Sequence, residues 1–232
     1  MADGQLPLAL PFKPALGPGD FLPHAGVQLA LDVMASETPW PQHRLVLWGG
    51  PGVGKTHLLH VWASKTGASV VDGRLLREPF WPEGSISIDD ADQVPSEEAL
   101  LHVLNAAAES GHRLLLTSTR PPARRRIRLA DLASRLRATM AVELGPQDDD
   151  MLAALLAKLL SDRQIVVPPP IQKWMLTRLP RTAATIREAV ERLDYAALAA
   201  QSSVSRGLAA ECLADLLLTD LSPNEMPQES SP

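Results

Sequence analysis

The chain is poor in cysteine and has no long apolar run. A single cysteine, Cys212, in 232 residues excludes a disulfide framework and a zinc ribbon, and favours a reduced setting. No apolar run approaches the roughly 20 residues of a membrane span, and no basic region followed by an apolar one opens the chain. The net charge of −5 argues against a protein that binds mainly by coating nucleic acid. These absences predict a soluble, cytoplasmic protein with no membrane partner.

Proline, by contrast, is abundant, and its 21 residues gather where the chain is expected to be irregular. Four prolines in residues 1–18 predict an extended N-terminal tail, because proline cannot donate a backbone hydrogen bond. The polar, proline-bearing residues 221–232 predict a disordered C-terminal tail. Between the tails, the apolar content suffices for one core or for a core with a small additional lobe.

Apolar runs of strand length alternate with helical patterns between the tails. Strands are predicted at 45–48, 68–72, 84–89, 113–117 and 140–144, and helices at 27–34, after residue 54 and at 96–110. From Asp148 the pattern is helical, with one helix at 148–160, one after the prolines at 168–170, one carrying Ile186 and Val190, and a last one over 208–216. The sequence therefore predicts an α/β core over residues 19–146, a parallel sheet with helices on both faces, followed by a small helical lid over 147–220.

The segment that follows the first apolar strand carries the most specific pattern. Glycines lead into Gly54-Lys55-Thr56 and then into an apolar helix, which is the P-loop pattern. Loop N–H groups and the helix N-terminus surround phosphate oxygens, the lysine reaches the β- and γ-phosphates, and the threonine hydroxyl binds Mg²⁺. We therefore expect ADP or ATP, with Mg²⁺, at Gly49, Gly50, Pro51, Gly52, Val53, Gly54, Lys55 and Thr56.

Two further strand ends carry polar side chains suited to ATP chemistry. Asp89 is predicted to hold Mg²⁺ through water and Asp90 to act as a general base, with an ordinary acidic turn as the alternative; Asp92 is expected to be a solvated turn residue. The next strand ends in Thr117 and Thr119, candidates for a polar sensor of the γ-phosphate. Hydroxyls that merely cap the strand are an equal alternative.

Three segments together resemble motifs of the bacterial replication initiator DnaA and its relatives. They are the P-loop and its helix at 50–60, the Leu-Thr-Ser-x-Arg run within 114–121, and Leu-Ala-Asp-Leu-Ala-Ser-Arg-Leu at 129–136. The resemblance spans about residues 19–218 and implies an AAA+ fold, with the nucleotide between an α/β core and a helical lid. It implies that Phe21 and Leu22 pack around adenine; ordinary core residues are the alternative.

The resemblance also implies that Arg135 is an arginine finger that acts on the ATP of a neighbouring protein. From the residues alone, a surface ion pair with Asp131 is the alternative. A second sensor arginine is expected early in the third lid helix, but Ala184 occupies that position, and Arg181 and Arg187 are the candidates to replace it. The displaced sensor predicts a bound nucleotide that serves as a structural ligand, and puts hydrolysis by the chain itself in doubt.

A regulator, rather than an initiator, is the function that the resemblance implies. The chain stops near Asp220, where initiators continue into a DNA-reading domain, and the span 56–89 has little room for the helix that initiators use on single-stranded DNA, so no sequence-specific DNA binding is expected. Residues 5–10 resemble the peptide that docks on the replicative sliding clamp, with contacts from Gln5, Leu6, Leu8 and Leu10. The implied protein binds the DNA-loaded clamp and DnaA, stimulates hydrolysis of DnaA-bound ATP, and prevents over-initiation.

Other interpretations stay open. A helicase-loader-type AAA+ ATPase, acting on the replicative helicase, would not need residues 5–10, and a small-molecule kinase would leave 129–136 unexplained. The arginines within 120–128 form either a solvated basic loop or a patch that meets DnaA or DNA. His57 and His60 lie one helical turn apart but lack a third metal ligand, which favours packing over metal binding. Assembly into a homo-oligomer is also open.

Overall fold

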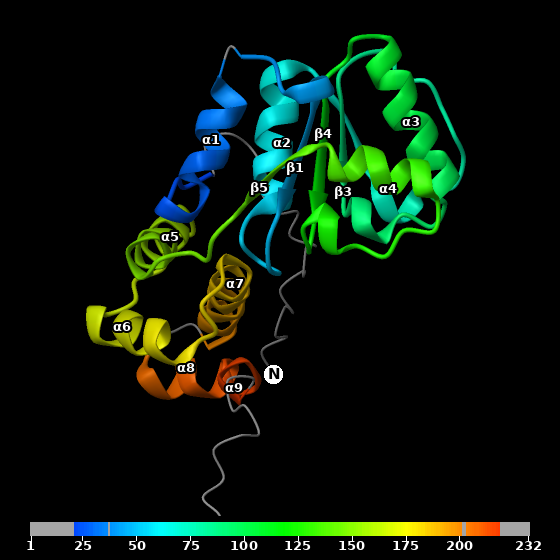
Figure 1. Cartoon of the computed structure of the whole chain (residues 1–232). Helices are drawn as coiled ribbons and strands as arrows, with labels where there is room; N and C mark the ends of the chain where they lie inside the picture. The colour runs from blue at the N-terminus through cyan, green and yellow to red at the C-terminus, as the bar shows by residue number, and fades with distance from the viewer. Residues whose placement is uncertain (1–20, 37, 201–202, 219–232) are drawn as a thin grey trace, which may run out of the picture. The chain divides into compact units, whose positions relative to one another are not determined.

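Five parallel strands form a single sheet in the first part of the molecule (Figure 1). The computed structural model describes residues 21–36, 38–200 and 203–218. The strands are β1 (Arg44–Trp48), β2 (Ser69–Asp72), β3 (Ile86–Asp89), β4 (Leu114–Ser118) and β5 (Met140–Glu143). They lie in the order β2-β3-β4-β1-β5, and every pairing is parallel. All five strands coincide with predicted ones within about two residues.

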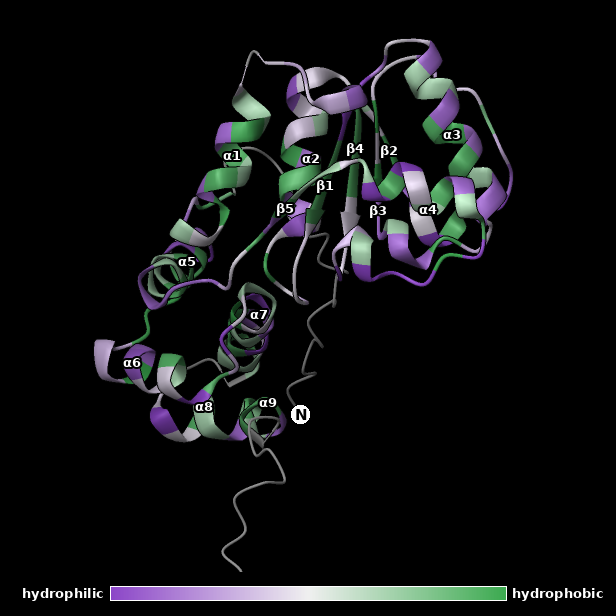
Figure 2. Cartoon of the chain, in the orientation of Figure 1, coloured by the Kyte–Doolittle hydropathy of each residue, from purple (hydrophilic) through white to green (hydrophobic). Residues whose placement is uncertain are grey.

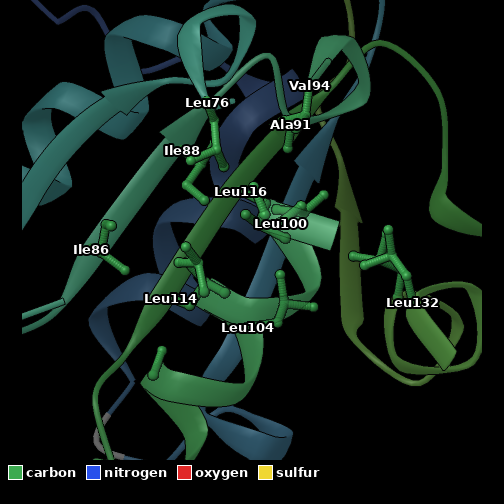
Figure 3. Packing of buried hydrophobic residues seen from close by; sticks show 14 of the residues in the cluster. Leu76, Ile86, Ile88, Ala91, Val94, Leu100, Leu104, Leu114, Leu116 and Leu132 are labelled. Carbon is green, nitrogen blue, oxygen red and sulfur yellow. The ribbon is translucent and has the colours of Figure 1, made fainter. Parts of the chain in front are cut away.

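Helices cover both faces of this sheet, because alternate residues of its strands are apolar on both sides. Leu45 and Leu47 of β1 belong to a cluster with α1 (Gln28–Ala35) and α2 (Lys55–Thr66). Val46, between them, belongs to the opposite cluster, with α3 (Glu97–Glu109) and α4 (Ala130–Arg137). Figure 3 shows this second cluster, and the central strands carry the hydrophobic colour in Figure 2. The predicted α/β core with a parallel sheet and helices on both faces is confirmed.

Helix α3 begins where its first residues satisfy free backbone N–H groups. The hydroxyl of Ser96 accepts the N–H of Ala99 at 3.1 Å, as expected for an N-cap. The carboxylate of Glu97 accepts the backbone N–H groups of Arg128 at 3.0 Å and Leu129 at 2.9 Å. Burial opposes ionisation there, but these hydrogen bonds and nearby arginines hold the pKa of Glu97 below its usual value. The start of α3 is thereby tied to the start of α4.

The connection from β2 to β3 is short and lies against the end of β3. It contains one turn of 3-10 helix, η4 (Gly73–Leu75), and residues 76–85 add no helix or strand. A Cβ at Gly73 would come within 2.6 Å of the carbonyl oxygen of Asp89 and 2.7 Å of that of Asp90. Only glycine therefore allows the η4 turn to approach the acidic end of β3 so closely.

A second compact unit begins at Asp149 and is helical. Helix α6 begins at the second residue of the proline triplet, where a missing N–H group costs nothing. Among the described residues, no helix is long and apolar enough to cross a membrane. The helices of this second unit are α5 (Asp149–Asp162), α6 (Pro169–Arg178), α7 (Ala183–Ala200), α8 (Arg206–Cys212) and α9 (Ala214–Leu218).

The end of this unit corrects one prediction. A single helix was expected over 208–216, but the structure has two short helices that meet at Leu213. The backbone of Leu213, at φ −107° and ψ 4°, departs from helical values while its side chain is fully buried. The apolar spacing continues across the break, so the side-chain pattern did not reveal it.

Candidate functional site

The loop between β1 and α2 folds around the lysine that follows it. Lys55 Nζ donates hydrogen bonds to the carbonyl oxygens of Gly49, at 2.9 Å, and Gly50, at 2.8 Å. Its side chain is buried, and burial lowers the pKa of Lys55. Three carboxylates oppose that shift, those of Asp90, Asp92 and Asp89. The structure therefore brings the P-loop lysine and the acidic end of β3 into one electrostatic neighbourhood.

Glycines allow this loop its curvature. Gly52, at φ +76°, and Gly54, at φ +100°, have backbone angles that other residues rarely adopt. A Cβ at Gly49 would lie 2.6 Å from the carbonyl oxygen of Leu144. The side chain of Gln147 donates to the carbonyl oxygen of Gly52 at 2.8 Å and so supports the loop from the segment after β5. The remaining predicted loop residues, Pro51, Val53 and Thr56, lie on the same turn, and Thr56 is exposed at the start of α2.

Thr117 of β4 links Asp89, the predicted Mg²⁺ residue, to Asp90, the predicted general base. Its hydroxyl donates to Asp89 Oδ1 at 2.5 Å and accepts the backbone N–H of Asp90 at 2.8 Å. Burial raises the pKa of Asp90, and the charge of Asp89 adds to that effect. Thr117 is fully buried, so its hydroxyl fixes the ends of β3 and β4 against each other.

The second hydroxyl candidate, Thr119, is bonded to another acid. Its backbone N–H donates to Asp92 Oδ2 at 2.9 Å, and its hydroxyl donates to the same oxygen. Asp92 is half-buried, so the expectation of a solvated turn residue was wrong. The reason is the adjacency of β3 and β4, which places the residues beyond their carboxyl ends side by side.

An arginine that the sequence analysis did not single out also lies at this edge. Arg74, in η4, forms an ion pair with Asp72 at 2.9 Å, and its Nε lies 3.8 Å from Asp90 Oδ2. The close approach at Gly73 brings Arg74 there. A basic residue two positions after an acidic strand end is too common a pattern to have signalled this contact.

Phe21 and Leu22 begin the described chain beside α2. The ring of Phe21 meets that of His57 edge-on, with centroids 5.2 Å apart, and both Phe21 and Leu22 are half-buried. Within the described residues, no group of three or more His, Cys, Asp or Glu side chains could hold a metal ion. His57 is thus found in ring packing, as the sequence favoured.

Arg135 lies toward the amino edge of the sheet, the edge at which the parallel strands begin. It stands in the last turn of α4, which leads into β5, and β5 pairs with β1 from Leu45 onward. Burial lowers the pKa of Arg44, and the charge of Arg135 is the second cause of that shift. Arg44 is the first residue of β1, whereas the P-loop follows the last. Arg135 and the P-loop are therefore near opposite ends of β1.

The guanidinium of Arg135 is paired within its own helix. Its Nε donates to both carboxylate oxygens of Asp131 at 3.1 Å, and 38% of its side chain is exposed. The hydroxyl of Thr139 donates to the carbonyl oxygen of Arg135 at 2.8 Å and secures the end of α4. The surface ion pair that the sequence offered as an alternative is therefore present.

Comparison with solved structures identifies the fold. Domain III of the replication initiation protein DnaA from Thermotoga maritima has a TM-score of 0.72 at 20% identity, over 90% of this chain and 99% of that chain. AMPPCP-bound DnaA from Aquifex aeolicus has a TM-score of 0.59 at 16% identity, over 77% of this chain and 65% of that chain. The chain has the AAA+ P-loop NTPase fold.

This AAA+ fold is not particular to initiators. The RuvB Holliday junction branch migration motor from Thermotoga maritima has a TM-score of 0.58 at 19% identity, over 75% of this chain and 61% of that chain. The chain thus spans less than two thirds of the Aquifex DnaA and of RuvB. No protein-family model matches the chain.

The remaining predicted residues belong to the helical unit or lie outside the described residues. In the helical unit, Arg181 is exposed and pairs with Asp149 at 3.1 Å, while Arg187 is half-buried on α7, one turn beyond Ala184. The clamp-binding residues Gln5, Leu6, Leu8 and Leu10, and the tail 221–232, lie outside the described residues. In the AAA+ core, the carboxyl edge of the sheet, where the parallel strands end, thus gathers the glycine loop, Lys55, Asp89 and Asp90.

Proposed function

We propose that this chain is a regulatory inactivator of DnaA of the Hda type. It binds ADP or ATP with Mg²⁺, docks on the DNA-loaded sliding clamp, and stimulates hydrolysis of the ATP bound to DnaA. The observation that carries the proposal is the position of Arg135, at the end of β1 opposite the P-loop of the same chain. An arginine there is remote from its own nucleotide but can face the nucleotide of a neighbour.

Nucleotide binding by the chain itself is supported by the fit of the carboxyl edge to a phosphate group. Among the described residues, the buried ammonium of Lys55 bonds to loop carbonyl oxygens alone, and a phosphate would give it an anionic partner. Thr56 and Asp89 are the residues that would hold Mg²⁺, whose charge would offset that of the phosphates. A related DnaA structure contains AMPPCP, a nucleotide analogue.

The finger action follows from the chemistry of the guanidinium. A planar, permanently charged group with several N–H donors can bind two oxygens of a γ-phosphoryl group as its negative charge spreads in the transition state. The exposed pair with Asp131 is worth only a few tenths of a kcal/mol, so exchanging that carboxylate for a phosphate costs little. The bond from Thr139 to the Arg135 carbonyl keeps the helix end in place during the exchange.

The choice of partner rests on two features. The chain shares the fold of DnaA domain III over nearly all of that domain, so it can present to DnaA the face that such domains have in common. Residues 5–10 supply the clamp contact, with Leu8 and Leu10 for an apolar cleft and Gln5 to set the register.

Single-turnover hydrolysis of ATP pre-bound to DnaA tests the proposal. We expect clamp-loaded DNA plus this chain to accelerate hydrolysis strongly, and Leu8→Ala with Leu10→Ala to remove most of the acceleration. No acceleration by the intact chain would refute the proposed function. Acceleration of the helicase ring's activity that ignores residues 5–10 would instead support a helicase-loader-type ATPase.

A further inference from the structure

The segment that links β4 to α4 carries a concentration of positive charge that the proposed function does not use. Residues 120–129 contain five arginines and no acidic residue. Arg120, Arg124, Arg126 and Arg128 are exposed, and within the described residues none of their side chains forms a hydrogen bond or an ion pair. Two acids influence this segment, Asp92 and Glu97. Asp92 is bonded to Thr119, and the carboxylate of Glu97 is bonded to the backbone of Arg128 and Leu129.

Side chains from Arg124 to Leu129 alternate between solvent and protein. Arg125 turns inward and donates from Nη1 to the carbonyl oxygen of Ala91 at 2.8 Å, and Ile127 and Leu129 pack against the α3/α4 cluster. Arg125 has extended backbone, at φ −81° and ψ 133°, whereas Arg124 ends the 3-10 turn before it. The exposed residues Arg124, Arg126 and Arg128 lie on the solvent side of this segment. We call these three residues the arginine row.

Both ends of the arginine row are fixed. At one end the η6 turn (Pro122–Arg124) is closed by a bond from the N–H of Arg124 to the carbonyl oxygen of Pro121 at 2.9 Å. At the other end Glu97 holds the N–H groups of Arg128 and Leu129. A charged row that is already ordered loses less conformational freedom on binding than a flexible loop does.

We propose that the arginine row binds the phosphate backbone of duplex DNA without sequence preference. Each exposed guanidinium offers several N–H donors to phosphate oxygens, and a DNA strand presents such oxygens at regular intervals along its backbone. The segment 120–129 has no aromatic residue on which bases could stack, which favours paired DNA over single strands. The net charge of −5 does not oppose this contact, because screening confines charge effects to about 10 Å.

Three or four phosphate contacts give weak binding by themselves. The clamp contact of the proposed function would hold the row near DNA and raise its effective concentration. That enhancement rests on the proposed function, whereas the DNA contact does not.

Fluorescence anisotropy with two labelled duplexes of unrelated sequence, over a series of salt concentrations, tests the proposal. The loop variant is Arg124→Gln with Arg126→Gln and Arg128→Gln. The control variant is Lys65→Gln with Arg77→Gln and Lys173→Gln, which removes the same charge from other exposed positions. We expect the unchanged protein to bind both duplexes with equal affinity. For the loop variant, the fall of log K with log salt should be less steep by about 2.7, or about 0.9 for each arginine. The control variant should keep that slope.

Three results would overturn the proposal. They are no binding of either duplex at low salt, equal losses in the loop and control variants, or intact DNA binding by a loop variant that no longer binds DnaA, which would make the row a protein contact. Unchanged ADP affinity shows that the loop variant folds, and the single Arg126→Gln variant gives the same test if the triple variant does not. DnaA binding by the loop variant is measured separately. The anisotropy assay itself contains neither DnaA nor clamp, so its failure and that of the proposed function are separate.

Discussion

The carboxyl edge of the sheet, where its strands end, and the amino edge, where they begin, differ in how their charged groups are paired. At the carboxyl edge, Lys55 is bonded to loop carbonyl oxygens and lies near three carboxylates, and Thr117 ties Asp89 to the backbone of Asp90. At the amino edge, Arg44 is 2% exposed, and its Nε and Nη1 have no hydrogen-bond partner in the described structure.

The other cations of the amino edge also lack a strong internal counter-charge. Arg113 lies over the ring of Trp40, 4.0 Å from its centroid, and Arg135 has only an exposed pair with Asp131. The carboxyl edge is thus balanced by acids of its own and suited to a ligand of its own. The amino edge holds surplus positive charge, which suits an anion that a neighbour brings.

Among the effects on nucleotide affinity and on stability, the largest is expected from removing the P-loop lysine of the carboxyl edge. Lys55→Met should weaken ADP and ATP binding about 100-fold, because charge-assisted hydrogen bonds to phosphate contribute about 1.5–3 kcal/mol. Titration with a fluorescent ADP analogue measures the loss. Lys65→Met, at the exposed far end of α2, is the matched control and should bind normally. Equal affinity in both variants would mean that the P-loop does not hold the nucleotide.

The next effect concerns the backbone of that edge. Gly49→Ala would place a Cβ 2.6 Å from the carbonyl oxygen of Leu144 and should lower the free energy of unfolding by about 1–3 kcal/mol. Gly50→Ala is its control, since a Cβ there meets only Val53, at 4.0 Å. Denaturant unfolding of both variants checks the difference, and similar losses would contradict the packing described for the loop.

At the amino edge, removal of a cation should raise the free energy of unfolding, whereas Gly49→Ala should lower it. Arg44→Met should raise the free energy of unfolding by about 1–2 kcal/mol, because an apolar side chain replaces a buried charge without partners. Arg113→Met loses the contact with Trp40 and should not stabilise the fold. A destabilised Arg44→Met variant would show that the surplus charge is compensated inside the protein.

The smallest effect is a pH dependence beside the carboxyl edge. Burial lowers the pKa of His24, against an opposing effect of Asp148, so the unfolded chain takes up a proton that the fold excludes. Stability should be full above the ordinary value of 6.5 and fall as the pH drops below it, by less than about 1.4 kcal/mol per pH unit.

Thermal unfolding between neutral and mildly acidic pH measures this dependence. His24→Gln should flatten the curve, whereas His43→Gln, at an exposed position, should leave it unchanged. A curve that keeps its slope without His24 would assign the acid sensitivity to another group.

Local patterns predicted most of the carboxyl edge. The strand, the glycines and the Lys55-Thr56 pair follow one another in sequence, and so do the apolar run and Asp89-Asp90 of β3. Which hydroxyl meets which acid was not predictable, because it depends on β3 lying beside β4. Thr117 and Thr119 look equivalent in the sequence, yet they bond to different acids.

The contacts that the sequence analysis missed join distant parts of the chain. Gln147 reaches Gly52 across 95 positions with no pattern to mark it, and Arg74 reaches Asp90 only because of Gly73. The predicted first strand began at Leu45, so Arg44 was left out as a flanking residue. Its burial is not encoded in the residue spacing along β1, and neither is the charge of Arg135 acting on it from α4.

The central claim is that the amino edge acts on the nucleotide of a partner, and Arg135 tests it most directly. An arginine finger can accelerate hydrolysis by a factor of about 10³–10⁵. In single-turnover assays with DnaA-bound ATP and clamp-loaded DNA, Arg135→Ala should remove this acceleration. Its own affinity for ADP should not change. Arg137→Ala, on the same turn of α4 and exposed, should retain the acceleration. Full acceleration by Arg135→Ala would contradict the account.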